Sequence, residues 1–261
     1  MRSTFLFLLC TAALTAHECW LQPLTFQPEA GQKVPLALLV GMDFQGDPRV
    51  FNRDRIAAFR RFSATGIEEL TPREEPSPHF DLPPLAAGTH VVAYDSTGSL
   101  ITLAADKFHA YLHEDGMEYV IALREKAGQS AAPGRERYRR CAKTIVQCGP
   151  AADGAHALRT DQTLEIVPLA NPATVRPGAS MKFQLLFQQT PLADTLVQAW
   201  HRANGHTTKL QGRTNAAGEV EFILPAGGEW MISTVRMIAT TDHADADWES
   251  YWGNLTFSIQ P

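Results

Sequence analysis

The chain has 261 residues, of which 44% are hydrophobic and 20% charged, and its formal net charge is -5. This composition is that of an ordinary globular protein, and the length suits one large domain or two small ones. Acidic residues outnumber basic ones and no basic stripe is visible, so nucleic acid is excluded as an expected partner.

The first sixteen residues have the layout of a secretory signal peptide. Arg2 precedes the apolar run 5–10, and small residues lead up to Ala16. The run is too short to span a membrane as a helix, and no other segment approaches about 20 apolar residues. We therefore expect a periplasmic or secreted protein that does not span a membrane once mature. A cut after Ala16 would make His17 the mature N-terminus, and a cut after Ala13 is the alternative.

Short alternating strands bounded by turn residues fill most of the remaining chain. Residues 34–40, 90–94 and 100–103 are examples, whereas 105–116 has the spacing of a short helix that ends at Gly116. From Leu164 onward, seven short strands occupy about 100 residues, the number expected of an immunoglobulin-like sandwich. The pattern predicts an all-β fold of two β-sandwich domains, the C-terminal one immunoglobulin-like.

The predicted domains are a signal peptide at 1–16, an N-terminal β-sandwich with a connecting region at 17–155, and the immunoglobulin-like domain at 156–261. Residues 128–154 change in character, because four arginines crowd between stretches of Gly, Pro and Ala. We interpret this segment as a connection that is partly strand, from Tyr138 to Val146. Its arginines are interpreted as a solvated face.

Three cysteines remain after export. An oxidising compartment favours pairing, and Cys141 and Cys148 are the natural disulfide pair because they close a small loop. Cys19 is then left over. Two interpretations of Cys19 stay open: a small buried residue beside Trp20, or a soft metal ligand.

His17 is the first candidate metal ligand. If export exposes it, its α-amino nitrogen and its imidazole nitrogen can chelate one transition metal, and nitrogen donors suit Ni, Co, Cu and Zn. Such a chelate is incomplete and needs further ligands from elsewhere in the fold. The alternative is that His17 merely begins an irregular terminus.

Two further histidines are candidate ligands. His243 lies among the aspartates of the segment 242–247, which can hold a divalent cation or form a solvated acidic loop. His90 lies early in a predicted strand, where a histidine either binds a metal or is packed and hydrogen-bonded. The candidate metal site is therefore His17, His90 and His243, with Ni, Co or Cu as the expected ion.

Common catalytic motifs are absent from the sequence: it has no phosphate-binding glycine loop, no HExxH and no GxSxG elbow. We therefore expect a protein that is not an enzyme. An aromatic set can either be exposed for sugar stacking or fill the core and the interface between the domains. The set is Trp200, Trp230, Trp248, Tyr251 and Trp252.

Four segments resemble, in order, a bacterial family of exported proteins of unknown function. They are His17–Pro23, Glu136–Lys143, Leu164–Pro172 and Asp247–Phe257. Members of this family are often labelled as periplasmic components of nickel uptake or cobalt transport. The resemblance implies β-sandwich architecture, and His17-Glu18 matches a recurrent family position that can bind metal. Cys19 departs from the aromatic residue expected there.

The resulting prediction is a periplasmic binding protein for a divalent transition metal, associated with nickel or cobalt uptake and with an inner-membrane metal transporter as partner. Two alternatives stay open. One is a non-catalytic envelope module that binds carbohydrate or protein through exposed aromatic residues. The other is a copper protein that uses an N-terminal histidine chelate together with a second histidine.

Overall fold

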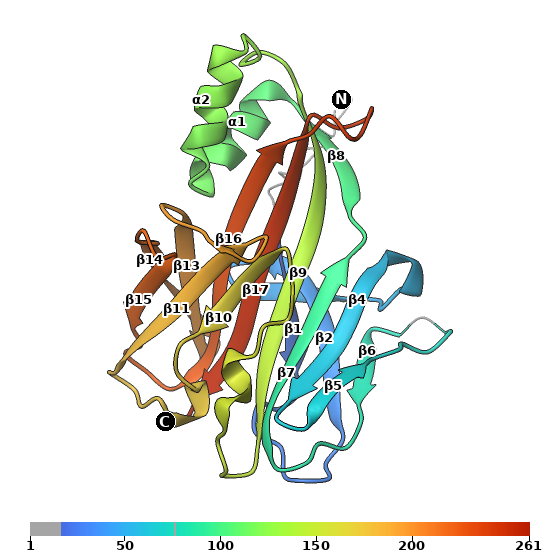
Figure 1. Ribbon diagram of the computed structural model, residues 1–261, viewed down its shortest axis with the longest axis vertical. Coiled ribbons are helices and arrows are strands. Elements are labelled where there is room, and N and C mark those ends of the chain that lie inside the picture. Colours follow the sequence, from blue (N-terminus) through green and yellow to red (C-terminus); the bar gives the residue numbers. More distant parts are fainter. Residues whose placement is uncertain (1–16, 76) are drawn as a thin grey trace, which may run out of the picture.

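The computed structural model describes residues 17–75 and 77–261 (Figure 1). The predicted signal peptide, residues 1–16, lies outside the described residues. The described part is built mainly of strands and contains two α-helices. The predicted all-β sandwich class is confirmed.

A nine-stranded sheet forms the centre of the molecule. All its pairings are antiparallel except that of β17 with β9, which is parallel, and β8 pairs with the start of β9. The order is β14 (His206–Arg213), β13 (Leu196–Ala203), β16 (Gly228–Ala239), β17 (Trp248–Ile259), β9 (Gly134–Cys148), β7 (Gly88–Ser96), β4 (Ile56–Ser63), β5 (Gly66–Glu69), with β8 (Ser99–Leu103) at the side.

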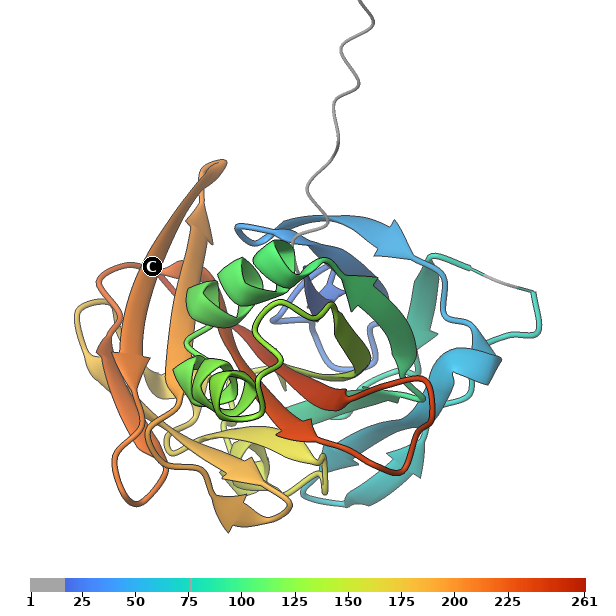
Figure 2. The ribbon, with the colours of Figure 1, turned by 90° about the horizontal axis from the view of Figure 1, so that it is seen from above.

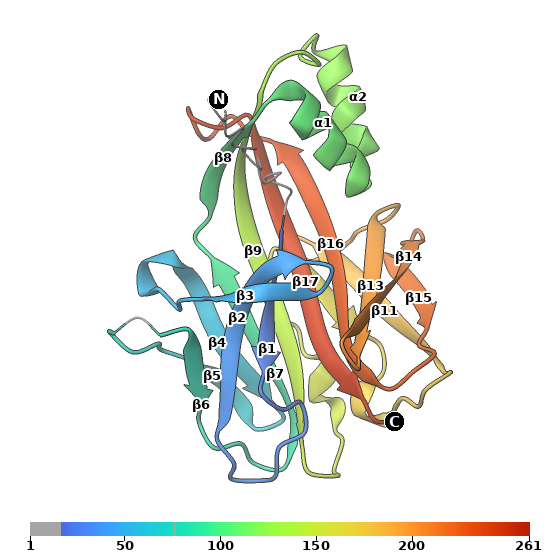
Figure 3. The same ribbon diagram turned by 180° about the vertical axis from the view of Figure 1, so that it is seen from behind.

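Two smaller sheets cover opposite faces of this central sheet, as the front and back views show (Figures 1 and 3). We call the first the N-terminal sheet; it contains β1 (Glu18–Pro23), β2 (Val34–Met42), β3 (Gln45–Arg49) and β6 (His79–Leu82). The second contains β10 (Leu164–Pro168), β11 (Ser180–Phe187), β12 (Thr190–Pro191) and β15 (Glu219–Ile223). Short 3-10 turns lie at Arg53–Arg55, Gly154–Ala157 and Pro172–Thr174.

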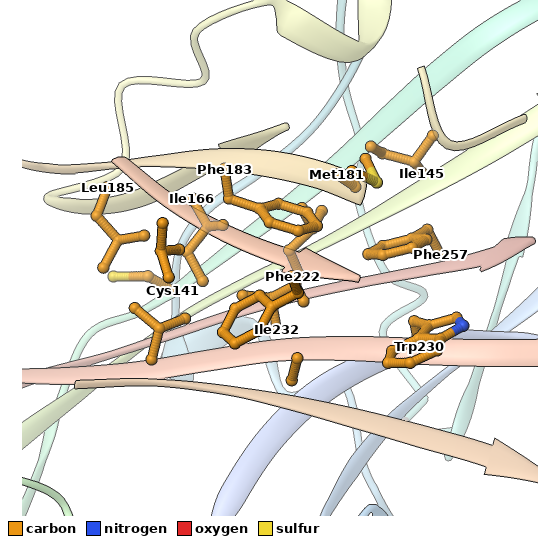
Figure 4. Packing of buried hydrophobic residues seen from close by; sticks show 14 of the residues in the cluster. Cys141, Ile145, Ile166, Met181, Phe183, Leu185, Phe222, Trp230, Ile232 and Phe257 are labelled. Carbon is orange, nitrogen blue, oxygen red and sulfur yellow. The ribbon is translucent and has the colours of Figure 1, made fainter. Parts of the chain in front are cut away.

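Successive side chains of a strand point to opposite faces of the sheet, so the central sheet contributes residues to two cores, one on each face. On β9, Cys141 and Ile145 point into a core shared with β10, β11 and β15 (Figure 4). The alternate residues Ala142 and Val146 point to the other face, into a core shared with β1 and β2. Because both faces of β9 are covered, its second half is buried at every position.

The two cores agree with the predicted sandwich class, and the C-terminal half has the two-sheet arrangement expected of an immunoglobulin-like sandwich. The core on that side also contains Phe62, Val91 and Ala93 from strands of the first half. The segment interpreted as a connection contains β9, the longest of the described strands. It pairs with β7 of the first half and with β17 of the second. The division at residue 155 stays a prediction, and the two halves on either side of it share one sheet.

The predicted helix at 105–116 is confirmed as α1 (Ala105–Glu114), and Gly116 follows it in the left-handed conformation, with φ of +69°. A second helix, α2 (Glu118–Lys126), comes directly after. Both pack on Trp248 and Trp252 of β17 and on neighbouring β16. These side chains lie on the same face of the central sheet as β1, and the view from above shows the helices over this end of the molecule (Figure 2).

The predicted Cys141–Cys148 disulfide is wrong. Both cysteines are free and buried, as is Cys19. The pair lies on one strand, seven residues apart, so the side chains point to opposite faces and enter different cores. Seven residues of strand span about 23 Å, far beyond the roughly 6 Å between the Cα atoms of a disulfide.

Within residues 17–75 and 77–261, no helix combines the length and apolar character needed to cross a lipid bilayer.

Candidate functional site

A strip of polar side chains separates the N-terminal sheet from the two helices on the shared face of the central sheet. Glu136, Ser250, Ser233 and Gln198 are all less than 9% exposed. They come from β9, β17, β16 and β13 respectively. Burying polar groups is unfavourable unless they have hydrogen-bond partners, so such a strip in an otherwise apolar face marks a candidate site.

A small cavity opens from this strip where β1 begins. We call it the seam cavity. It has a volume of about 50 Å³ and is lined by Glu18, Met42, Asp43, Glu114, Asp115, Gln198, Trp200 and Lys209. A narrow pocket next to it shares Glu18, Asp115 and Gln198 and is also lined by Ser233, Val235 and Trp252 of the central sheet. Four elements meet here: the start of β1, the end of α1, and the strands β13 and β16.

Two of the four carboxyl groups that line the seam cavity, those of Glu18 and Asp115, have abnormal proton affinity. Burial raises the pKa of Glu18 to about 7, an effect that Arg140 and Lys209 offset in part. Burial also raises the pKa of Asp115 well above its usual value, and the charge of Glu18 raises it further. Among the described residues, neither carboxyl group forms an ion pair. A cation placed between them would remove this penalty.

Arg140 of β9 holds the chain at the entrance to β1. Its Nη1 donates a hydrogen bond to the His17 carbonyl oxygen at 2.5 Å. Its guanidinium carbon lies 4.9 Å from the ring centroids of both Tyr138 and Trp252. The guanidinium is thus fixed by contacts with two aromatic rings and one carbonyl group.

A hydrogen-bonded network lies under the helices beside Arg140. Glu136 accepts hydrogen bonds from Tyr111 of α1, at 3.2 Å, and from Ser250 of β17. Trp252 Nε1 donates to the Ser250 hydroxyl at 3.2 Å. Burial raises the pKa of Glu136, and the hydrogen bonds from Ser250 and Tyr111 oppose that shift. The network joins α1 to the two parallel strands.

The β2–β3 turn forms another wall of the cavity. Asp43 and Phe44 both adopt positive φ, +53° and +56°, as a tight hairpin turn requires. This backbone conformation is unfavourable for a residue with a bulky side chain. The Phe44 ring is fully buried, packs edge-on to Trp20 at 5.5 Å, and lies under the Arg202 guanidinium. These contacts offset the strain and fix Asp43 at the cavity.

The three predicted metal ligands lie beside β9, next to different positions along that strand. His17 contacts Arg140, His90 pairs with Val146, and the His243 loop contacts Arg135 through the carbonyl of Ala244. Five and six residues separate these points on the strand, which correspond to about 16 Å and about 20 Å. The structure therefore does not bring the three histidines into one site.

His90 is packed in the core and is 4% exposed. Its Nε2 is 2.8 Å from the Ala86 carbonyl oxygen, and Nδ1 is buried without a partner. Burial lowers the pKa of the ring, which favours its neutral form. The structure thus shows the packed, hydrogen-bonded alternative considered for this histidine.

One carboxylate of the acidic loop around His243 is in an ion pair and is therefore not available as a metal ligand. Arg135 binds Asp247 through two nitrogens, at 2.5 and 2.9 Å, and this lowers the pKa of Asp247. Cys19 is equally unsuited to a metal, because burial raises the pKa of its thiol to about 11 and the side chain lies in the core. In the part of the chain that the structure describes, no three His, Cys, Asp or Glu side chains are grouped to hold a metal ion.

A larger hollow of about 370 Å³ lies at the rim of the N-terminal sandwich, between β5 and β6. Its lining carries charges of both signs, including an Arg73–Asp81 ion pair at 3.6 Å. None of the predicted ligands lines it, and it is remote from the polar strip. The seam cavity is therefore the better candidate despite its smaller volume.

Sequence reasoning missed Asp115, Glu136, Arg140 and Gln198. The signal that could have found two of them is the alternation along β9, where Glu136 and Arg140 are in phase with the apolar Ala142 and Val146. The interpretation of the arginines as a solvated face fails for Arg140, which packs between two aromatic rings. Asp115 has no such signal, because its position depends on how α1 docks.

Comparison with known proteins gives the chain a family. A family model described as a domain of unknown function, DUF4198, matches residues 14–237. The chain belongs to the DUF4198 family. The predicted resemblance to a family of unknown function is confirmed. No curated protein matches this DUF4198 chain.

The solved structures that match the chain have low sequence identity and low structural similarity to it. The fibronectin(III)-like modules of Clostridium thermocellum CbhA share 9% identity at a TM-score of 0.20, over 90% of this chain and 93% of that chain. Three N-terminal domains of the bacteriophage RB49 Highly Immunogenic Outer Capsid protein (Hoc) also share 9% at 0.20, over 93% of this chain and 59% of theirs. Likeness at this level carries no argument about the DUF4198 chain.

Proposed function

We propose that this DUF4198 protein is an exported binding protein for a divalent transition-metal ion, and that the site forms at the mature N-terminus, beside the seam cavity. The observation that carries the proposal is that His17 directly precedes β1, whose first residue, Glu18, lines the seam cavity together with the half-buried Asp115, and that neither carboxyl group has an ion-pair partner among the described residues. The nickel or cobalt label of the resembling family fits this proposal.

The donor groups suit such an ion. Cleavage after Ala16 gives His17 an α-amine next to its imidazole, and the carboxylates of Glu18 and Asp115 supply oxygen donors. Nitrogen with oxygen donors is a set that Ni²⁺, Co²⁺ and Cu²⁺ accept. Among the described residues, side chains alone do not form a group of three His, Cys, Asp or Glu that could hold a metal ion. The amine that cleavage creates is therefore a required part of the proposed site. Association with an inner-membrane metal transporter is part of the same proposal.

The carbohydrate-binding alternative has lost its support. It needs exposed aromatic rings, and Trp200, Trp230, Trp248 and Trp252 are each 5% exposed or less. The alternative that these residues fill the core is confirmed. A protein-binding envelope module and a copper protein with a second histidine stay predictions, and the metal titration below separates them from nickel or cobalt binding.

The test uses protein exported with its own signal. Intact mass should show a chain that starts at His17, and calorimetry should show one Ni²⁺ or Co²⁺ bound per chain. Because the amine and imidazole must be deprotonated, affinity should fall as the pH drops below about 6.5.

The matched control retains Ala16 in front of His17, which converts the α-amine into an amide and leaves every side chain in place. We expect this form to bind at least about 10-fold more weakly. Equal binding by both forms, or a processed wild-type chain that takes up none of Ni²⁺, Co²⁺ and Cu²⁺, would show the proposal to be wrong.

A further inference from the structure

The first residue of a mature chain is normally free to rotate, yet the structure contains a set of contacts that fixes residue 17. Arg140 donates from Nη1 to the carbonyl oxygen of His17, at 2.5 Å. The backbone beneath is also held, because the Arg140 N–H donates to the Ser96 hydroxyl at 2.9 Å. The contact therefore starts from a rigid point in the middle of the central sheet.

The same arginine is linked to the opposite wall of the seam cavity. Trp252, which lies 4.9 Å from the Arg140 guanidinium carbon, stacks on Tyr111 with ring centroids 5.8 Å apart and planes 8° apart. Tyr111 belongs to α1, and Asp115 caps the end of that helix. We call this row the Arg140–Trp252–Tyr111 stack. It runs from the residue that holds His17 to the helix that carries Asp115.

We propose that Arg140 is a positioning residue, and that the Arg140–Trp252–Tyr111 stack sets the mature N-terminus at a fixed place relative to Asp115. This inference rests on the proposed function. The carbonyl carbon and the amine of His17 are attached to the same Cα, so a hydrogen bond that fixes the carbonyl also restricts where the amine can point. Preorganised donors lose less entropy when a metal binds.

The chemistry of the side chain explains why an arginine stands here. A planar guanidinium can lie against aromatic rings and still direct an N–H at a carbonyl oxygen, whereas the lysine ammonium is a compact, strongly hydrated charge on a flexible stem. Replacement of Arg140 by Lys therefore keeps the charge beside Glu18 and removes the stacking geometry.

Arg139 provides a matched control. It is adjacent on β9, points to the opposite face, and pairs with Glu249 at 2.6 Å. The variant Arg139→Lys makes the same chemical change on the same strand without touching His17, Trp252 or Tyr111.

The first measurement is Ni²⁺ affinity of the processed protein, with the visible absorption spectrum of the bound ion as a report on its ligands. We expect Arg140→Lys to bind about 10-fold more weakly with a shifted spectrum, and Arg139→Lys to match the wild type. Arg140→Gln, which keeps an amide donor without the charge, should weaken binding at least as much. If the Arg140→Gln variant fails to fold, the positioning role is judged from the Ni²⁺ affinity and spectrum of Arg140→Lys alone.

The second measurement needs no metal: the rate at which an aminopeptidase removes His17 from the apoprotein. Release of the carbonyl should raise this rate about 10-fold in Arg140→Lys and leave it unchanged in Arg139→Lys. If wild type fails to bind any metal while the trimming rate still rises, the proposed function is wrong and the positioning of residue 17 stands. If wild type and Arg140→Lys bind Ni²⁺ alike, with the same spectrum and the same trimming rate, the positioning role is wrong.

Discussion

Individual carboxyl groups at buried or half-buried positions carry much of the unusual chemistry of this chain. Glu18 and Asp115 face the seam cavity on one side of the central sheet. Asp95 lies on the other side, where Gln162 Nε2 donates to its Oδ1 at 3.2 Å. Burial is the largest cause of the raised pKa in all three. Each group therefore binds its proton more tightly in the folded chain than in the unfolded one.

This predicts an inverted pH dependence for Asp95, whose pKa is raised from 3.8 to about 6. Below pH 3.8 both states are protonated and the group costs nothing. Between pH 3.8 and about 6 the unfolded chain loses the proton while the folded chain keeps it, so stability falls over this interval and stays at the lower level above it. At about 1.4 kcal/mol per pKa unit, the loss is about 2–3 kcal/mol.

The variant Asp95→Asn should not show this loss. In urea unfolding between pH 4 and 8, with chelator present, the stability of wild type should fall relative to Asp95→Asn by about 2–3 kcal/mol. Asp47→Asn, which changes an exposed carboxylate on β3, is the control and should track the wild type. Parallel curves for wild type and Asp95→Asn would contradict the assignment.

At the scale of elements, the two helices do more than cover the sheet. Strand β13 pairs with β16 over residues 229–233, so the upper part of β16 has no strand on that edge in the described structure. Tyr119 of α2 replaces it at one point: its hydroxyl donates to the Met237 carbonyl at 2.8 Å and accepts from the Met237 N–H at 2.9 Å. Backbone groups left unpaired in a buried place are costly.

Removal of that hydroxyl should loosen the helices. We expect Tyr119→Phe to lower the free energy of unfolding by about 1–3 kcal/mol, because two backbone groups lose their partner. Amide hydrogen exchange at Met237 should accelerate. Tyr138→Phe removes a hydroxyl that makes no hydrogen bond to the described residues, and it should change stability by less than about 0.5 kcal/mol. Equal effects of the two changes would refute the bridging role.

At the scale of the molecule, the two halves are joined through β9. Its parallel pairing with β17 and antiparallel pairing with β7 make one sheet of strands from both halves. A fully buried ion pair adds to this connection: Lys143 Nζ of β9 lies 2.8 Å from Glu165 Oε1 of β10. Thr160 donates to the same carboxylate oxygen from its backbone N–H and its hydroxyl. Burial lowers the pKa of Lys143, and Glu165 opposes the shift.

Breaking this pair should destabilise the whole chain. Lys143→Met leaves a buried carboxylate without its cation and should cost about 3–5 kcal/mol in urea unfolding. The double variant Lys143→Met/Glu165→Leu should recover part of that loss, because no unpaired charge remains. Lys182→Met, on the exposed side of β11, is the control. A Lys143→Met protein as stable as the control would show that the pair contributes nothing.

The sequence by itself determined the local features. Period-2 alternation, turn residues and the 3.6-residue spacing at 105–116 indicated the strands and α1, because these depend on neighbours within a few residues. The predicted sandwich class follows from the same local patterns. His17-Glu18 could be singled out as a candidate pair, since the signal layout and the family resemblance both point to it.

Tertiary structure decided what each of these features contacts. The pairing of β9 with β17 joins segments more than 100 residues apart, and no local pattern specifies it. Once β9 extends to Cys148, strand geometry alone sends Cys141 and Cys148 to opposite cores, which the shorter predicted strand concealed. The seam cavity likewise exists only after β1 and α1 dock on the same face, which brings Glu18 and Asp115 together. Local propensity acts over a few residues, whereas a site of this kind is made by long-range packing.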